Sequence, residues 1–160
     1  MKLKIGESEV DLDPKHLEVN EENLNEHLKT FAGTYSYYNA MLSKAQFIQF
    51  LTEDKYEQTY SERFQYYKDN EAGSDKRAEA KTTINDNVIK AKRAVREAKY
   101  ISQLTLGYVR ALEKAHENAL NLGYNIRKEI GSIYPQVIRE SGIPADIEKQ
   151  AEQLFKEMDG

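Results

Sequence analysis

Apolar residues recur at helical spacing over most of the chain, beginning near residue 24. Between residues 24 and 45 they step alternately by four and three positions, which keeps one stripe on a single helix face. The pattern continues less regularly to residue 67. Its members are Leu24, Leu28, Phe31, Tyr35, Tyr38, Leu42, Ala45, Ile48, Leu51, Tyr56, Tyr60, Phe64 and Tyr67. We therefore predict an amphipathic helix over residues 20–68, with Asn20 as its N-cap.

A second apolar stripe runs from Ile84 to Ile133, in a segment without proline. As one helix, residues 76–133 span about 87 Å, whereas a compact domain of this size is only about 40 Å across. The helix must therefore break or project. Gly107 and Gly123 are the predicted break points, because glycine costs roughly 1 kcal/mol relative to alanine inside a helix. The pattern ends at Tyr134-Pro135, since proline disfavours helical backbone in the residue before it.

Three further segments complete a predicted single domain, residues 1–160. Residues 1–19 alternate in two short runs, which indicates a hairpin or an extended arm. Residues 69–75 have the composition of a tight turn. After a second break, residues 144–158 form a short acidic amphipathic helix that must dock on something. The predicted fold is all-α: a long antiparallel, coiled-coil-like helical hairpin whose apolar face is buried within the chain or between chains of a homo-oligomer.

Composition narrows the class of protein. Hydrophobic residues make up 39% and charged residues 31%, with a mean hydropathy of -0.79, which is typical of long, thin helical packing. The chain has no cysteine, which excludes disulfides and thiolate metal sites. No apolar run reaches the length of a membrane span. We expect a cytoplasmic protein without membrane contact.

Charge is unevenly distributed along the chain. The net charge is -4, yet residues 76–99 carry eight basic and three acidic side chains, a local net charge of +5. Residues 1–30 and 140–160 each have a net charge of -4. The overall charge therefore disfavours a purely electrostatic nucleic-acid binder, whereas the basic middle segment favours a local binding surface.

The sequence predicts no catalytic residues, no cofactor and no metal ligands. Histidines 16, 27 and 116 are far apart in sequence. The spacing of Glu113 and His116 is the one used in di-iron helical bundles, but such sites need a second pair and two more inward-facing glutamates. There is also no glycine-rich phosphate loop and no nucleophile elbow. We predict that the protein is not an enzyme.

Basic and aromatic residues gather where the two long helices are joined. Cations hold phosphates and aromatic faces stack on bases, for roughly 1–3 kcal/mol per base, so this combination is typical of single-strand binders. Lysines and arginines on one face of the second helix extend the positive track. The candidate nucleic-acid-binding residues are Arg63, Tyr66, Tyr67, Lys68, Lys76, Arg77, Lys81, Lys92, Arg96 and Lys99. The alternative, that the aromatic residues fill the core and the charges only solvate the helix, stays open.

Ordered pieces of the chain, from about residue 10 to residue 130, resemble the UvsY-type recombination mediators of large tailed phages. Residues 11–18 resemble the lead-in to that family's first helix, and the run from Arg63 to Tyr67 resembles the Arg-x-x-Tyr-Tyr at its end. Residues 79–83 and the run from Gly123 to Arg127 resemble parts of its second helix. A basic residue that the family carries two positions before the arginine is Ser61 here.

The resemblance implies a role in DNA recombination and repair. It implies a homo-oligomeric ring that binds single-stranded DNA, contacts the phage single-strand-binding protein and helps to load a RecA-like phage recombinase. By matching position, it implies a DNA contact at Arg63 with Tyr66 and Tyr67 beside it. The segment after Ile133 exceeds the family pattern. The alternative hypothesis is a structural or chaperone-like coiled-coil assembly protein without nucleic-acid binding.

Overall fold

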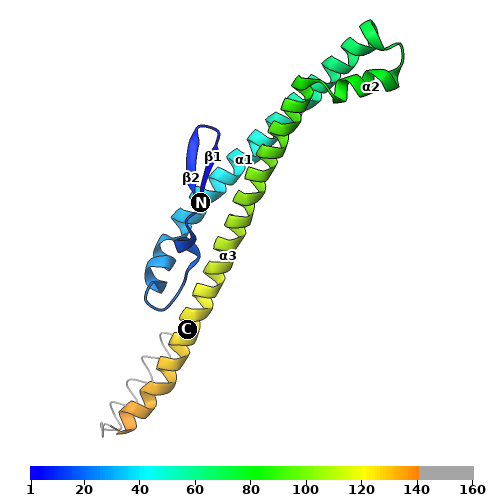
Figure 1. Cartoon of the computed structure of the whole chain (residues 1–160). Coiled ribbons are helices and arrows are strands. Elements are labelled where there is room, and N and C mark those ends of the chain that lie inside the picture. The colour runs from blue at the N-terminus through cyan, green and yellow to red at the C-terminus, as the bar shows by residue number, and fades with distance from the viewer. Residues whose placement is uncertain (141–160) are drawn as a thin grey trace.

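The computed structural model describes residues 1–140, apart from the side chains of residues 71, 72 and 132–140. The fold-class prediction is confirmed at the coarse level, because the chain is mostly helical with a short N-terminal strand pair and one very long helix (Figure 1). The helix predicted over residues 144–158 lies outside the described residues.

The N-terminal arm is a two-stranded antiparallel β-hairpin followed by a short 3-10 helix. Strand β1 (Lys2–Ile5) pairs with β2 (Ser8–Asp11). Gly6 turns the chain between them with a φ of 62°, a conformation that glycine adopts at little cost. The 3-10 helix η1 (Pro14–Leu17) is capped by Asp13, whose carboxylate accepts a 3.0 Å hydrogen bond from the backbone N–H of Lys15. The sequence is compatible with either a hairpin or an extended arm over residues 1–19, and the structure contains a hairpin.

Helix α1 (Leu24–Tyr67) starts four residues after the predicted N-cap. Asn20 and Asn23 exchange hydrogen bonds, each side chain accepting from the other's backbone N–H at 3.0 and 2.9 Å. This reciprocal pair resembles a capping box, although a non-helical turn fills residues 21–23. Asn20 therefore caps the turn that leads into the helix, and the predicted boundary at residue 20 is early.

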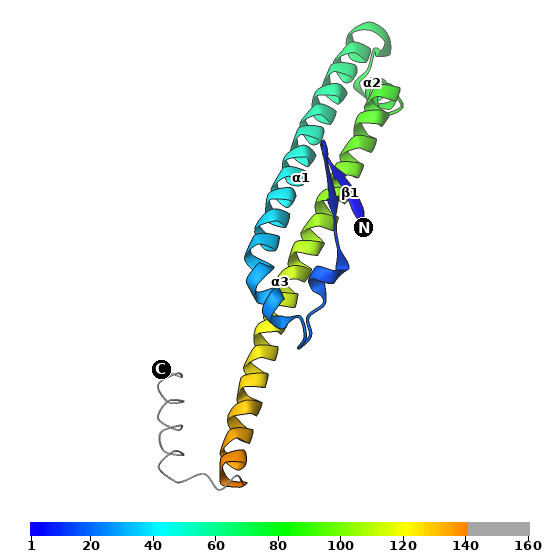
Figure 2. The ribbon, with the colours of Figure 1, turned by 90° about the vertical axis from the view of Figure 1, so that its left-hand side faces the viewer.

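Helix α3 (Asp86–Glu140) lies beside α1 and runs in the opposite direction (Figure 2). The phenol of Tyr35 donates a 2.6 Å hydrogen bond to the Glu113 carboxylate, which ties the two helices together. Most residues of the predicted stripes are buried or half-buried between them. Among the stripe residues whose side chains are described, the exceptions are Leu28, Leu51, Ile84 and Ile130, which are exposed. Among the described residues, no other element lies beside the part of α3 that extends past the start of α1 (Figures 1 and 2).

The predicted break points in the second long segment are wrong. Helix α3 passes through Gly107 and Gly123, and the break instead separates α2 (Asp75–Thr83) from α3. Asn85 makes this break, because its side chain accepts a 3.0 Å hydrogen bond from the backbone N–H of Asn87 and so caps the new helix. A glycine weakens a helix only modestly, whereas a competing cap offers the backbone another partner.

The predicted helix end at residue 133 is also early, since α3 continues through Pro135 to Glu140. Proline removes one backbone donor without ending this helix. The predicted turn at residues 69–75 is made by a π-helical segment η2 (Lys68–Ala72) and by Gly73, which has a φ of 63°. Ser74 then caps α2 by accepting a 3.4 Å hydrogen bond from the backbone N–H of Arg77.

The hydrophobic core lies where the β-hairpin covers the two long helices. Its buried side chains come from all three elements: Ile5, Val10, Leu12, Tyr38, Leu42, Ala45, Tyr108, Val109 and Leu112. Within the described residues, no helix is long and apolar enough to cross a membrane.

Two buried tyrosines fasten the N-terminal arm to the helices. The Tyr38 hydroxyl donates to the Asp11 carbonyl at 2.6 Å, and the Tyr108 hydroxyl donates to the Asp13 carbonyl at 2.7 Å. His16 Nδ1 lies 3.1 Å from the Tyr108 hydroxyl oxygen. Burial raises the pKa of the Tyr108 phenol well above its ordinary value, so the hydroxyl keeps its proton and remains a donor.

A stack of aromatic rings lies at the start of α1. Phe31 stacks on His116 of α3 with ring centroids 3.8 Å apart, and the His27 and His116 rings are 5.9 Å apart. Within the described residues, His27 Nε2 and His116 Nδ1 are buried without a hydrogen-bond partner. Burial, and then the nearby His116, lower the pKa of the His27 imidazole below its ordinary value. The stack therefore favours the neutral form of His27.

Replacing Tyr108 by phenylalanine should lower the free energy of unfolding by about 0.5–1.5 kcal/mol, because the Asp13 carbonyl loses one of its two donors and keeps only the backbone N–H of His16. Urea unfolding followed by circular dichroism measures the change. Tyr124→Phe is the matched control, since Tyr124 is 63% exposed and should change stability by less than about 0.5 kcal/mol. Equal stability of the two variants would contradict the role assigned to the Tyr108 hydroxyl.

Acidification should destabilise the fold through His27. Because the folded state lowers the pKa of His27, the unfolded chain takes up its proton first as the pH falls through about 6.5, and the free energy of unfolding decreases as the pH falls below about 7. His27→Asn should make this pH dependence shallower in urea unfolding at several pH values. An unchanged slope would show that other groups cause the acid sensitivity.

Candidate nucleic-acid interface

An open groove of about 510 Å³ lies between α1 and α3 near the α2 end of the molecule. We call it the distal groove. Its lining residues are Thr52, Lys55, Thr59, Glu62 and Arg63 from α1, and Asn87, Lys90, Ala91 and Ala94 from α3. The positions on α3 are spaced by three and four residues, so they share one helix face. The groove is therefore a property of two regular helices and needs no loop.

The distal groove continues the line that the β-hairpin covers. Lys4, Ile5 and Gly6 of the hairpin share a small cavity with Ala45, Ile48, Ala98 and Ile101 of the long helices. From Ala45 the heptad steps continue through Ile48, Thr52, Lys55 and Thr59 to Glu62, but the residues become polar. The apolar half is covered by the hairpin, and the polar half is left open beyond the turn at Gly6 (Figure 2).

Three cations from both long helices line the distal groove. Lys55 and Arg63 come from α1 and Lys90 from α3, against one carboxylate, Glu62. Arg63 is half-buried at this site. The small side chains of Ala91 and Ala94 leave the space into which these cations face. An arginine in the wall of a groove offers a planar set of donors that matches two oxygens of a phosphate.

The two tyrosines that end α1 have different environments. Tyr67 is half-buried and its hydroxyl accepts a 2.9 Å hydrogen bond from the Asn85 side chain, which joins the end of α1 to the break before α3. The Lys81 ammonium lies 5.8 Å from the centre of the Tyr67 ring. Tyr66 is 48% exposed and packs edge-on against Tyr67. Of the two rings, Tyr66 has the free surface that stacking on a base requires.

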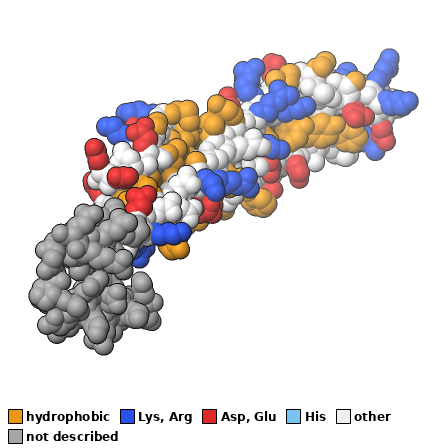
Figure 3. Space-filling view, turned by 90° about the horizontal axis from the view of Figure 1, so that it is seen from below, with side chains coloured by type: hydrophobic (Ala, Val, Ile, Leu, Met, Phe, Trp, Pro, Cys, Tyr) orange, Lys and Arg blue, Asp and Glu red, His pale blue; other side chains and the backbone are white. Residues whose placement is uncertain are grey.

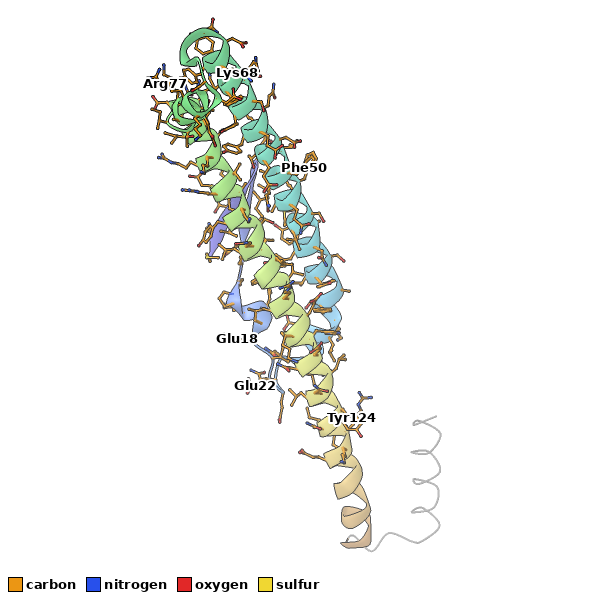
Figure 4. All side chains as sticks on the ribbon, turned by 90° about the vertical axis from the view of Figure 1, so that its right-hand side faces the viewer. Glu18, Glu22, Phe50, Lys68, Arg77 and Tyr124 are labelled. Carbon is orange, nitrogen blue, oxygen red and sulfur yellow. The ribbon has the colours of Figure 1, made fainter. Side chains whose placement is uncertain are left out.

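The remaining predicted cations near the turn lie at the α2 end of the molecule (Figure 4). The Lys68 ammonium is 3.2 Å from the Asp75 carboxylate and 6.0 Å from the centre of the Phe64 ring. Lys76 and Arg77 are exposed on α2. These residues form a charged cap beyond the groove, in which Lys68 already has an acidic partner.

Three predicted cations lie outside the distal groove. Lys92, Arg96 and Lys99 are exposed, and none of them is among the groove residues. Because successive residues of a helix are about 100° apart, Lys90 and Lys92 project about 200° apart. The structure therefore divides the predicted track into a groove set and a set on the outer face of α3.

Sequence reasoning missed Lys55 and Lys90 as partners of Arg63. The signal for Lys55 was present, because it continues the heptad steps from Ala45 after the apolar residues end. Lys90 can be recognised as a groove residue only when the packing of α3 against α1 is known, and the sequence does not specify that packing directly.

Within the described residues, no group of three or more His, Cys, Asp or Glu side chains is arranged to hold a metal ion. The Glu113 and His116 pair has structural contacts instead, with Tyr35 and Phe31 respectively.

Comparison of the chain with models of protein families, with curated proteins and with solved structures finds no match.

Replacing Asn85 by alanine should lower the free energy of unfolding by about 0.5–2 kcal/mol, because α3 loses its cap and Tyr67 loses a hydrogen bond. Amide hydrogen exchange should be faster at Asn87. Asn118→Ala is the control, since Asn118 is exposed within α3 and alanine is the better helix former. If exchange at Asn87 is unchanged, Asn85 is not the cap that separates α2 from α3.

Proposed function

We propose that this chain is a recombination mediator that binds single-stranded DNA in the distal groove and helps to load a RecA-like recombinase in place of a single-strand-binding protein. The observation that carries the proposal is the convergence of Lys55, Arg63 and Lys90 on one open groove. The resemblance of the sequence to UvsY-type mediators supports the recombinase and single-strand-binding protein as partners. The position implied by that resemblance, Arg63, is one of the groove residues.

The shape of the groove favours a single strand over a duplex. Packed helices have axes about 8–10 Å apart, so a groove between two of them can admit one extended backbone. Three cations offer contacts to successive phosphates, and Thr52, Thr59 and Asn87 add neutral hydrogen-bonding groups. Exposed Tyr66 lies beyond the groove, where a base could stack on it for about 1–3 kcal/mol.

Assembly overcomes the unfavourable net charge. A single groove with three cations and one carboxylate binds weakly, and the chain as a whole has a net charge of -4. We propose that the long antiparallel, coiled-coil-like hairpin forms a homo-oligomeric ring that presents several grooves to one strand. Linked sites of this kind gain a factor of about 10²–10⁴ in avidity without new contacts.

The second candidate is a structural or chaperone-like coiled-coil assembly protein without nucleic-acid binding. Exposed apolar residues on the long helices favour it, since surfaces of this kind mark contacts with other proteins. Figure 3 shows hydrophobic side chains along the helices, with Lys and Arg side chains beside them. This candidate requires no role for the basic groove, which is where the two proposals differ.

The test is a titration of a fluorescent single-stranded oligonucleotide at several salt concentrations. The variant Lys55→Ala/Arg63→Ala/Lys90→Ala should bind more weakly, and the slope of log K against log salt should become shallower by about 2. The reason is that each phosphate contact to a single strand contributes about 0.7 to this slope.

A control variant of equal charge is Lys29→Ala/Arg110→Ala/Lys128→Ala, whose residues are exposed and outside the groove. It should keep most of the slope. If both variants lose the same amount of slope, the effect comes from net charge, and the groove is not the binding site. Absence of any salt-dependent binding by the wild-type protein would favour the assembly protein. The loading step is tested by whether the wild-type protein speeds recombinase assembly on strands coated with single-strand-binding protein.

A further inference from the structure

The outer face of α1, turned away from α3, carries an exposed apolar patch. Phe47 is 61%, Phe50 58% and Leu51 49% exposed. Their spacing by three and four residues places them on one side of the helix, and the Phe50 ring points away from the molecule (Figure 4). Exposed Asp54 and Glu57 follow one and two turns later. We call these five residues the α1 outer face.

The outer face of α3 has the complementary composition. Tyr100 is 60% and Ile89 41% exposed. Between them, on the same side of the helix, lie the exposed cations. We call this set the α3 outer face: Ile89, Lys92, Arg93, Arg96, Lys99 and Tyr100. Within the described residues, none of its cations, and neither Asp54 nor Glu57, forms an ion pair.

The two faces also match along the length of the molecule. The contacts of Tyr35 with Glu113 and of Tyr38 with Tyr108 fix the antiparallel register of α1 and α3. In that register Phe47 is level with Tyr100. Asp54 is level with Arg93. One apolar pair and one pair of opposite charges therefore lie at matching heights on opposite sides of the same molecule.

We propose that a second copy of this chain docks side by side, with the α1 outer face of one copy against the α3 outer face of the next. The proposal deepens the homo-oligomer of the proposed function and rests on it. Phe47 and Phe50 pack against Tyr100 of the neighbouring copy, while Asp54 and Glu57 meet Lys92, Arg93 and Arg96. Opposite charges at matched heights suppress other registers.

The interface joins two different surfaces, so each copy has one face of each kind free for another neighbour. All hairpins and distal grooves then lie on the same side of the assembly. Lys92, Arg96 and Lys99 consequently bind the neighbouring copy, and the groove cations alone bind the strand. The contact thus assigns different roles to two sets of cations that are adjacent in the sequence.

Charge reversal of each face tests the proposal by sedimentation velocity, without nucleic acid and at about 0.1 M salt. The first variant is Asp54→Lys/Glu57→Lys, and the second is Lys92→Glu/Arg93→Glu/Arg96→Glu. Each alone should associate more weakly, on the order of tenfold or more per reversed charge, because like charges then face each other. Circular dichroism verifies that both variants fold, as expected for exposed positions.

Mixing the two variants is the decisive experiment. In the mixture a basic α1 outer face meets an acidic α3 outer face, so association should return, with the two variants in equal amounts. Recovery also excludes misfolding as the cause of the separate losses. Assembly that survives both reversals, or a mixture that stays dissociated, would overturn the proposal, and so would a wild-type protein that is monomeric.

The outcome is separable from that of the proposed function. Self-association is measured without DNA, and the groove variant Lys55→Ala/Arg63→Ala/Lys90→Ala should assemble like the wild type while binding the oligonucleotide more weakly. A protein that assembles through these faces but binds no DNA would keep this inference and reject the mediator. If DNA binding is lost in Lys92→Glu/Arg93→Glu/Arg96→Glu and does not return in the reassembled mixture, those cations belong to the DNA site, which would contradict the roles assigned here.

Discussion

The line of contact between α1 and α3 is the constraint on which the rest of the structure depends. Two long helices can pack over this distance only if small or apolar residues recur at heptad spacing on both. Apolar residues satisfy this requirement around Leu42, Ala45 and Leu112, where the β-hairpin adds a third layer. Nearer to α2 the same spacing continues in polar residues, and the hairpin ends. The distal groove arises because the helical repeat continues while the residues at its positions change from apolar to polar.

The two parts of this line need different kinds of stabilisation. Around Tyr38 and Tyr108, burial comes with hydrogen bonds from phenols to carbonyls of the N-terminal arm, because a buried carbonyl without a partner is costly. Near the groove, one hydrogen bond between Asn85 and Tyr67 joins the helix ends instead. The groove can thus stay open, since its neighbours hold the two helices in place. Arg63 is half-buried there and still lines the open groove, so a ligand can reach it.

Much of the fold could be predicted from the sequence because the apolar stripes are long and regular. Tyr38, Leu42, Ala98 and Leu112 are all buried where the stripe places them. The break before α3 could not be found by searching for glycine. Asn85 is a weak signal until its side chain is seen to accept the Asn87 N–H, and Ile84 resembles a stripe residue although it is 73% exposed. Local hydrogen bonding by an asparagine outweighed the small cost of two glycines.

The candidate site was predictable only in part, since charge counted along a sequence is not charge on a surface. Residues 76–99 have a net charge of +5, but α2 and α3 distribute it in different directions. Lys90 joins Arg63 in the groove, whereas Lys92 lies about 200° around the helix, on the outer face. A long helix can therefore present two unlike surfaces from one basic run. Which cations act together is decided by the helical repeat and by the neighbour that each side of the helix faces.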